Sequence, residues 1–316
     1  MPLLKRLRTL AAKVESTNGT AESLTAAEGV FNAYDLMVQA DIEVEERQAQ
    51  GSFDYLVGSP GARRGSVSFK TDVGWDGSAL PAWASVLFPA CGYVESSQVF
   101  TPQSEAPGSN VKTVTIGGFQ AGRRKFLAGA VGNFRIVCPT GRMVTIEWEF
   151  QGVWQAVTDQ TLIAPTYPTS AALRFGSGVV TYNSVAQKVE NVTFDAGNEI
   201  KILEDPSTAS GFSYGIITSR RPVITLNPES QLVATEDRYG DWIAGNEYAF
   251  SCAIDGPTGL VSNGSITIAA PKAQVFNVQE GDRDGVEIDE VELRCNKNAA
   301  NKDQDVSITF TDKADA

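Results

Sequence analysis

The segment Gly211-Phe212-Ser213-Tyr214-Gly215 is the closest match to a catalytic motif in this sequence. It fits the G-x-S-x-G pattern, in which a serine on a sharp turn acts as the nucleophile. Such a serine needs a neighbouring base, most often histidine, to accept its proton. The chain of 316 residues contains no histidine. This absence also removes Cys-His catalysis and histidine-ligated metals, so we interpret the segment as a loop and expect no enzyme.

Carboxylates are the other groups that could carry chemistry. An acidic run extends from Asp282 to Glu290, but an EF-hand needs glycine at its sixth position, where this run has Glu287. A solvated turn is therefore expected. Glu147 and Glu149 lie two residues apart and point to the same side of one strand, whereas a glycosidase pair must face its substrate from two sides. We expect no catalytic pair, no bound metal and no cofactor.

The cysteines and the charge restrict the class of protein further. Cys91, Cys138, Cys252 and Cys295 form no C-x-x-C pair. Two disulfides are an alternative in an oxidising compartment, but buried free thiols in a cytosolic protein are our interpretation. No apolar stretch resembles a signal peptide or a membrane span. The net charge of −12 disfavours a protein that binds nucleic acid tightly, but it does not exclude one along which nucleic acid slides without binding.

The elements that position these groups are organised around the segment 134–154. Apolar residues recur at every second position from 134 to 138 and again from 144 to 150, on either side of a Pro-Thr-Gly break. This period of two is typical of half-buried strands, so the segment predicts a β-hairpin. One of its faces is apolar and the other carries Glu147 and Glu149. The function depends on what the polar face meets.

The rest of the first half predicts strands, one helix and two long loops. We expect strands over 34–45, 62–69 and 111–116, a helix over 79–91, and loops over 48–60 and 98–110. At the N-terminus Leu3, Leu7, Leu10 and Val14 recur at helical spacing among basic residues. This pattern predicts a short amphipathic helix or arm. Two interpretations stay open, a frayed basic terminus and an arm that docks on an acidic neighbouring copy.

The pattern of the first half is repeated after a proline-containing segment, Pro165–Ser170. Strands are expected over 188–203, 219–226, 248–254, 265–269, 286–294 and 305–311, with a helix over 236–244 and a Pro-Thr-Gly turn over 256–259. We interpret the repeat as a tandem duplication, although chance similarity between two β-rich halves is the alternative. The predicted division is an N-terminal arm and loop (1–33), a first domain (34–164), a linker (165–175) and a second domain (176–316).

Several segments of the first half, taken in order, resemble the tail tube proteins of long-tailed, siphovirus-type bacteriophages. They are Lys13-Val14-Glu15-Ser16-Thr17-Asn18-Gly19-Thr20, the basic start of the strand 62–69, the helical segment ending in Cys91-Gly92, the strand 111–116, the glycine-rich 126–133 and the hairpin. The resemblance implies a mainly β fold of two tandem β-sandwich or half-barrel domains, each with a short flanking helix. It also implies rings whose inner sheets join into a β-barrel lumen that conducts viral DNA.

From this resemblance we expect a structural virion protein of the phage tail, made in the host bacterial cytoplasm. A duplicated chain would form trimeric rings with pseudo-sixfold symmetry. Other tail proteins, such as the tape measure, terminator and distal tail proteins, would be its partners. The expected lumen-facing residues are Glu147, Glu149, Glu43 and Glu45. The expected inter-ring contacts are Lys5, Arg6, Arg8, Phe53 and Tyr55.

Two other functions are alternatives. A tail terminator or a capsid-decorating protein could be built from similar β domains, but it would cap once rather than polymerise. A carbohydrate- or surface-binding β-sandwich module would use exposed tryptophans as platforms. The candidates for that role are Trp75, Trp83, Trp148, Trp154 and Trp242.

Overall fold

The computed structural model describes residues 6–75, 79–176, 178–255, 264–298 and 302–312, and its fold is mainly β, as predicted. The helices α1 (Ala82–Ala90) and α2 (Arg238–Ala244) lie where two helices were expected. The first-half strands are β1 (Arg8–Val14), β2 (Ala33–Gln48), β3 (Tyr55–Asp72), β4 (Tyr93–Ser96), β5 (Val99–Pro102), β6 (Val114–Gln120), β7 (Arg123–Pro139), β8 (Thr145–Trp154) and β9 (Thr158–Asp159). The second-half strands are β10 (Val180–Tyr182), β11 (Val185–Ala186), β12 (Val189–Asp195), β13 (Asn198–Glu204), β14 (Phe212–Arg220), β15 (Val223–Pro228), β16 (Glu247–Asp255), β17 (Gly264–Arg283), β18 (Val286–Cys295) and β19 (Ser307–Asp312).

The predicted hairpin over 134–154 is confirmed as the antiparallel pair β7 and β8. Phe134 lies opposite Trp148 in the register, and both side chains are buried. Phe88 of α1 packs on this apolar face, with its ring centroid 4.9 Å from that of Phe134 and 5.4 Å from that of Trp148. Gly141 in the connecting turn has a φ of 75°, a left-handed conformation that favours glycine. Alternation therefore sets one face of the hairpin against the core.

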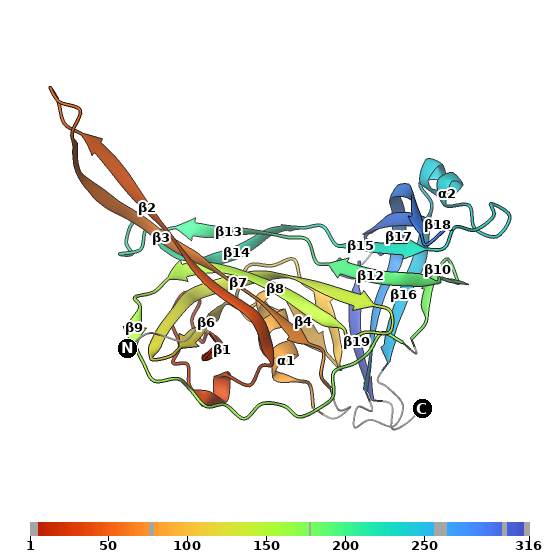
Figure 1. Cartoon of the computed structure of the whole chain (residues 1–316), viewed down its shortest axis with the longest axis horizontal. Helices are drawn as coiled ribbons and strands as arrows, with labels where there is room; N and C mark the ends of the chain where they lie inside the picture. The colour runs from red at the N-terminus through yellow and green to blue at the C-terminus, as the bar shows by residue number, and fades with distance from the viewer. Residues whose placement is uncertain (1–5, 76–78, 177, 256–263, 299–301, 313–316) are drawn as a thin grey trace.

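The two halves contribute to one continuous antiparallel sheet (Figure 1). Eight strands follow one another in the order β2–β3–β8–β7–β12–β15–β18–β17. The joint between the halves is the pairing of β7 with β12, from Pro139 opposite Asn191 to Arg135 opposite Asp195. The sheet has β2 at one end and the last residues of β17 at the other.

The strand order of the first half recurs in the second. It is β1–β6–β7–β8–β3–β2 in the first half and β10–β16–β17–β18–β15–β12 in the second. Each helix lies in the chain between corresponding strands. This order supports the predicted duplication. The domain boundaries stay a prediction, because the halves share one core in which Phe310 of β19 contacts Trp75 and Phe100.

The predicted N-terminal helix is wrong over the described residues. Residues 8–14 form strand β1, which pairs with β6 from Arg8 opposite Gln120 to Val14 opposite Val114. Four consecutive residues, Thr9 to Ala12, are buried. A strand covered on both faces has no period of two, so the apolar spacing imitated a helix.

Three further predictions are corrected by the strand boundaries. The loop expected over 48–60 is a turn of residues 49–54 only, because β2 and β3 continue as a two-stranded ribbon. The segment 211–215 is the start of β14 rather than a loop. The strand expected over 188–203 is two strands, β12 and β13, interrupted at Ala196-Gly197. The turn expected over 256–259 lies outside the described residues.

Candidate assembly surfaces

The polar face of the β7–β8 hairpin carries Glu147 and Glu149 on the side away from the core. The carboxylate of Glu147 forms an ion pair with Lys70 of β3, with a distance of 2.8 Å between Nζ and Oε1. Hydrogen bonding to Glu147 raises the pKa of Lys70. Glu149 is exposed and lies opposite Ser68 and Asn133 in the register. Of the two predicted lumen residues, Glu147 is therefore largely neutralised by its neighbour.

A second charge pair lies beside this one, at the joint between the halves. Arg135 of β7 pairs with Asp195 of β12 at 3.0 Å, and the amide of Asn133 donates to the same carboxylate at 3.0 Å. The face thus carries charges of both signs rather than carboxylates alone. The expected acidic wall depends on Glu149 more than on Glu147.

The other two predicted lumen residues, Glu43 and Glu45, are exposed on β2. Asp41 lies on the same strand and pairs with Arg64 of β3 at 2.6 Å. Hydrogen bonding to Asp41 raises the pKa of Arg64, with a smaller electrostatic contribution from Glu43. These carboxylates lie on the projecting ribbon, and Glu43 shares a cleft with Glu149.

The residues predicted to contact the next ring lie in two places. Lys5 is outside the described residues and Arg6 is exposed. The guanidinium of Arg8 donates to the carbonyl of Leu36, so it already has a partner within the chain. Phe53 is in the turn of the ribbon and is fully exposed, and Tyr55 beside it is 63% exposed. The N-terminal and ribbon candidates are not brought together into one surface.

The outer part of the ribbon β2–β3, which projects away from the body (Figure 1), carries exposed apolar side chains among exposed carboxylates. Val44, Leu56 and Val57 are exposed there, Val57 to 87%. Exposed apolar side chains gathered on one element mark an interaction surface. The ribbon is therefore the strongest candidate for a contact with another copy.

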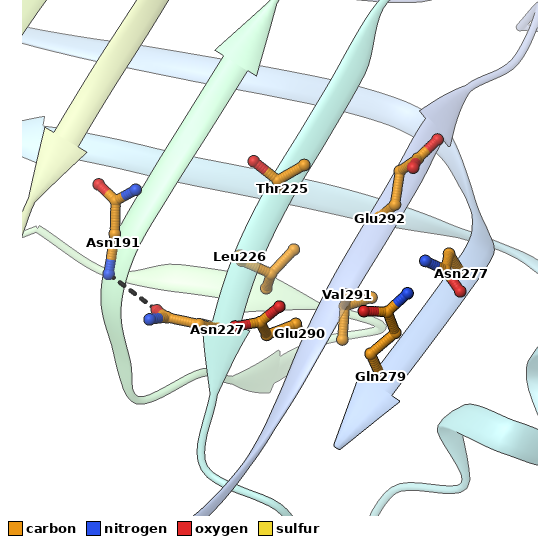
Figure 2. A pocket seen from close by; sticks show the side chains of 9 residues that line it. All are labelled: Asn191, Thr225, Leu226, Asn227, Asn277, Gln279, Glu290, Val291 and Glu292. Atoms are coloured by element: carbon orange, nitrogen blue, oxygen red, sulfur yellow. Dashed lines mark hydrogen bonds between the residues drawn. The ribbon is translucent and has the colours of Figure 1, made fainter. Parts of the chain in front are cut away.

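A shallow groove of about 320 Å³ lies on the second half, over β12, β15, β17 and β18. Figure 2 shows its side chains, which are mostly amides and carboxylates projecting from neighbouring strands. The Oδ1 of Asn227 accepts a hydrogen bond from the backbone of Asn191 at 2.9 Å. Glu290 and Glu292 of β18 occupy the groove as Glu149 occupies the polar face of the first half.

The tryptophans and acidic groups give little support to the alternative sites. Trp75, Trp83 and Trp148 are buried and Trp154 packs against the core, so only Trp242 is well exposed, at 40%. The acidic run forms the turn between β17 and β18, where Asp284 and Gly285 have positive φ. Among the described residues, no group of three or more acidic or thiol side chains is placed to hold a metal. All four cysteines are free and buried.

One buried carboxylate that ties the first half together was missed in the sequence. The carboxylate of Glu15, which is 4% exposed, accepts hydrogen bonds from the hydroxyls of Thr113 and Thr115 at 2.6 and 2.8 Å. The backbone N–H groups of Gly19 and Gly129 donate to it at 2.7 Å each. The available signal was that Glu15 lies in the segment 13–20, one of the segments that resemble tail tube proteins. Glu15 is structural, because its hydrogen-bonding capacity is used within the chain.

A protein-family model matches this chain over almost its whole length. The family described as phage tail tube protein matches residues 6–314. No curated protein matches the sequence. In the part of the chain that the structure describes, no helix is both long and apolar enough to cross a membrane.

Proposed function

We propose that this chain, which belongs to the phage tail tube protein family, assembles into stacked rings that form the conduit for DNA ejection. The chain is a structural protein of the virion tail. The proposed ring contains three chains with pseudo-sixfold symmetry. Tape measure, terminator and distal tail proteins are its proposed partners inside the tube and at its ends.

The observation that carries this proposal is the eight-stranded sheet with two open ends. Among the described residues, β2 pairs only with β3, and the last part of β17 pairs only with β18. Open strand edges favour pairing with another chain, and closing the sheet removes them. The pairing of β7 with β12 is a template for this contact within the chain itself. We infer that β2 of one copy pairs with β17 of the next until three copies close a barrel.

The electrostatics of the polar face suit a conduit. DNA has to pass without being held, and carboxylates repel phosphate. We propose that Glu149, Glu147, Glu43 and Glu45 lie on or near the wall of the lumen. Glu149 has no ion pair among the described residues and is the residue expected to matter most, whereas Lys70 neutralises Glu147.

Electron microscopy of the purified protein across a concentration series tests the assembly. We expect hollow stacked rings or tubes whose image symmetry corresponds to three chains per ring. Rings of six chains would contradict the trimer and the proposed role of the duplication. A protein that stays monomeric, even when mixed with preformed tails that could initiate polymerisation, would overturn the tube proposal and favour a terminator, a decoration protein or a surface-binding module.

Charge reversal tests the lumen. Glu149→Lys places a cation on the proposed wall, and we expect slower or arrested DNA ejection from assembled particles. Asp159→Lys, at an exposed position of β9, makes the same change of charge elsewhere and is the matched control. If the Glu149→Lys particles eject DNA at the rate of the control, Glu149 does not line the lumen.

A further inference from the structure

The chain contains two ribbons of equal length that occupy corresponding places in its two halves. The first runs from Ala33 at the start of β2 to Asp72 at the end of β3, and the second runs from Val189 of β12 to Pro228 of β15. The second ribbon is interrupted at Ala196-Gly197 and Arg221-Pro222. Its outer part, β13–β14, lies across β7, β8 and β3 of the first half (Figure 1).

Apolar packing and backbone hydrogen bonds hold β13–β14 in place. Phe212 and Ile202 are each 8% exposed and form a cluster with Val153 of β8 and Ala62 of β3. The backbone N–H of Arg63 donates to the carbonyl of Ser210 at 3.0 Å. The second ribbon thus covers the first half of its own chain.

Asn198 anchors the inner end of the same segment. Its side-chain amide donates to the carbonyls of Cys91 and Gly132 at 2.8 and 2.9 Å. Its backbone N–H donates to the side chain of Asn133 at 3.1 Å. Farther out, Lys201 lines the same cleft as the carboxylate of Glu149. Lys201 forms an ion pair with Glu204 of the same ribbon at 3.5 Å.

The outer part of the first ribbon has comparable groups but no such cover. Tyr55 opens β3 as Phe212 opens β14, yet Tyr55 is 63% exposed and Phe212 only 8%. Leu56 and Val57 follow it and are also exposed. The charged residues of this outer part are mostly acidic, because Arg47 is accompanied by Asp41, Glu43, Glu45, Glu46 and Asp54. The ribbon leaves the body on the side away from α2, so it cannot fold onto the second half of its own chain (Figure 1).

The groove of Figure 2 lies where a cover of the second half would sit. It is formed by β12, β15, β17 and β18, the counterparts of the strands that surround β13–β14 in the first half. Its carboxylates are Glu290 and Glu292, and Glu292 already pairs with Arg294 at 3.5 Å.

We propose that the outer part of β2–β3 of one copy docks in this groove on the second half of the next copy. The contact repeats between chains the contact that β13–β14 makes within the chain, and it buries Tyr55, Leu56 and Val57. It lies within a ring rather than between rings, because the intrachain contact joins halves that share one sheet. This inference rests on the proposed function. A head-to-tail contact of this kind closes a ring when its rotation allows.

Cysteine crosslinking tests the contact in assembled protein. The double variant Val57→Cys with Gln279→Cys places one thiol on the ribbon and one in the groove. All four native cysteines are buried, so mild oxidation acts on the introduced thiols. We expect disulfide-linked species under non-reducing conditions in a ladder that ends at the trimer, since the ring closes there. Val57→Cys with Val157→Cys, which moves the second thiol to an exposed site of the first half, is the matched control.

The outcomes separate this inference from the proposed function. Normal tubes without crosslinks, or with no more than the control, would overturn the ribbon contact and leave the tube intact. A ladder that continues beyond the trimer would place the ribbon between rings and overturn the contact as stated. Failure to form any assembly, with tails present as initiators, would overturn the tube proposal itself. Val57→Asp should in addition weaken ring formation more than Val157→Asp does.

Discussion

The two ribbons of this protein differ less in sequence than in what lies beneath them. Both are antiparallel strand pairs of equal length that extend from corresponding strands of the sheet. The second buries Phe212 and Ile202 on the first half of its own chain, whereas the first leaves Tyr55 and Val57 exposed. The exposure of an apolar residue in the first ribbon therefore reflects a missing neighbour rather than a weakly apolar strand. The second ribbon therefore serves as an internal model of an interface.

The largest expected difference concerns the apolar anchor at the start of each outer strand. Phe212→Ala should lower the free energy of unfolding of the monomer by about 3 kcal/mol, because it removes a buried aromatic ring. Tyr55→Ala should change it by less than about 0.5 kcal/mol, as exposed substitutions usually do. Denaturant unfolding of the dilute protein measures both. Equal losses would contradict the contrast between a covered and an uncovered ribbon.

The next difference concerns the bend. Gly197 has a φ of 65°, and an added Cβ would lie 2.0 Å from the carbonyl oxygen of Arg221. Gly197→Ala should therefore cost about 2 kcal/mol or more, since both the backbone conformation and the contact oppose it. Gly51 in the turn of the first ribbon has a φ of 78° but no atom within 4 Å of an added Cβ. Gly51→Ala should cost only about 1 kcal/mol, and thermal unfolding would compare the two.

A smaller effect is expected at the polar anchor of the second ribbon. Asn198→Ala leaves the carbonyls of Cys91 and Gly132 without their side-chain donor, which should cost about 1–2 kcal/mol. In this variant, amide hydrogen exchange should become faster in β13–β14 than in the parent protein, and should change less in the β7–β8 hairpin. Unchanged exchange in β13–β14 would mean that the apolar cluster alone holds this segment.

The smallest effect is expected at Arg63. Its guanidinium donates to the carbonyl of Ala209 at 2.5 Å, but the side chain is at the surface. Arg63→Ala should cost no more than about 0.5 kcal/mol, because the backbone hydrogen bond to Ser210 is kept and water replaces the lost donor. Urea unfolding midpoints of this variant and the parent give the comparison. A loss as large as that of Phe212→Ala would assign the docking energy to polar contacts.

Much of the secondary structure could be predicted because it follows from the spacing of apolar residues over short stretches of the sequence. The alternation between 134 and 150 gave the β7–β8 hairpin and its buried face, and the helices α1 and α2 were placed within a few residues. The N-terminal strand was missed because β1 is buried on both faces. The strands of the inner ribbon were predicted, but its outer residues 48–60 were mistaken for a loop because glycines, a proline and polar residues there are typical of turns. Glu147 and Glu149 were placed on one polar face correctly, but their role in a lumen stays a prediction.

Local sequence patterns are enough to assign the class of this protein: a mainly β chain without histidine, duplicated in pattern and similar to tail tube proteins. Alternation decides which side of a strand is apolar, and this information lies within a few residues. The folded chain was needed to show which strands become neighbours, that Lys70 pairs with Glu147, and that one ribbon is covered while the other is exposed. Those facts depend on pairings between residues far apart in the chain, and a local pattern does not encode them.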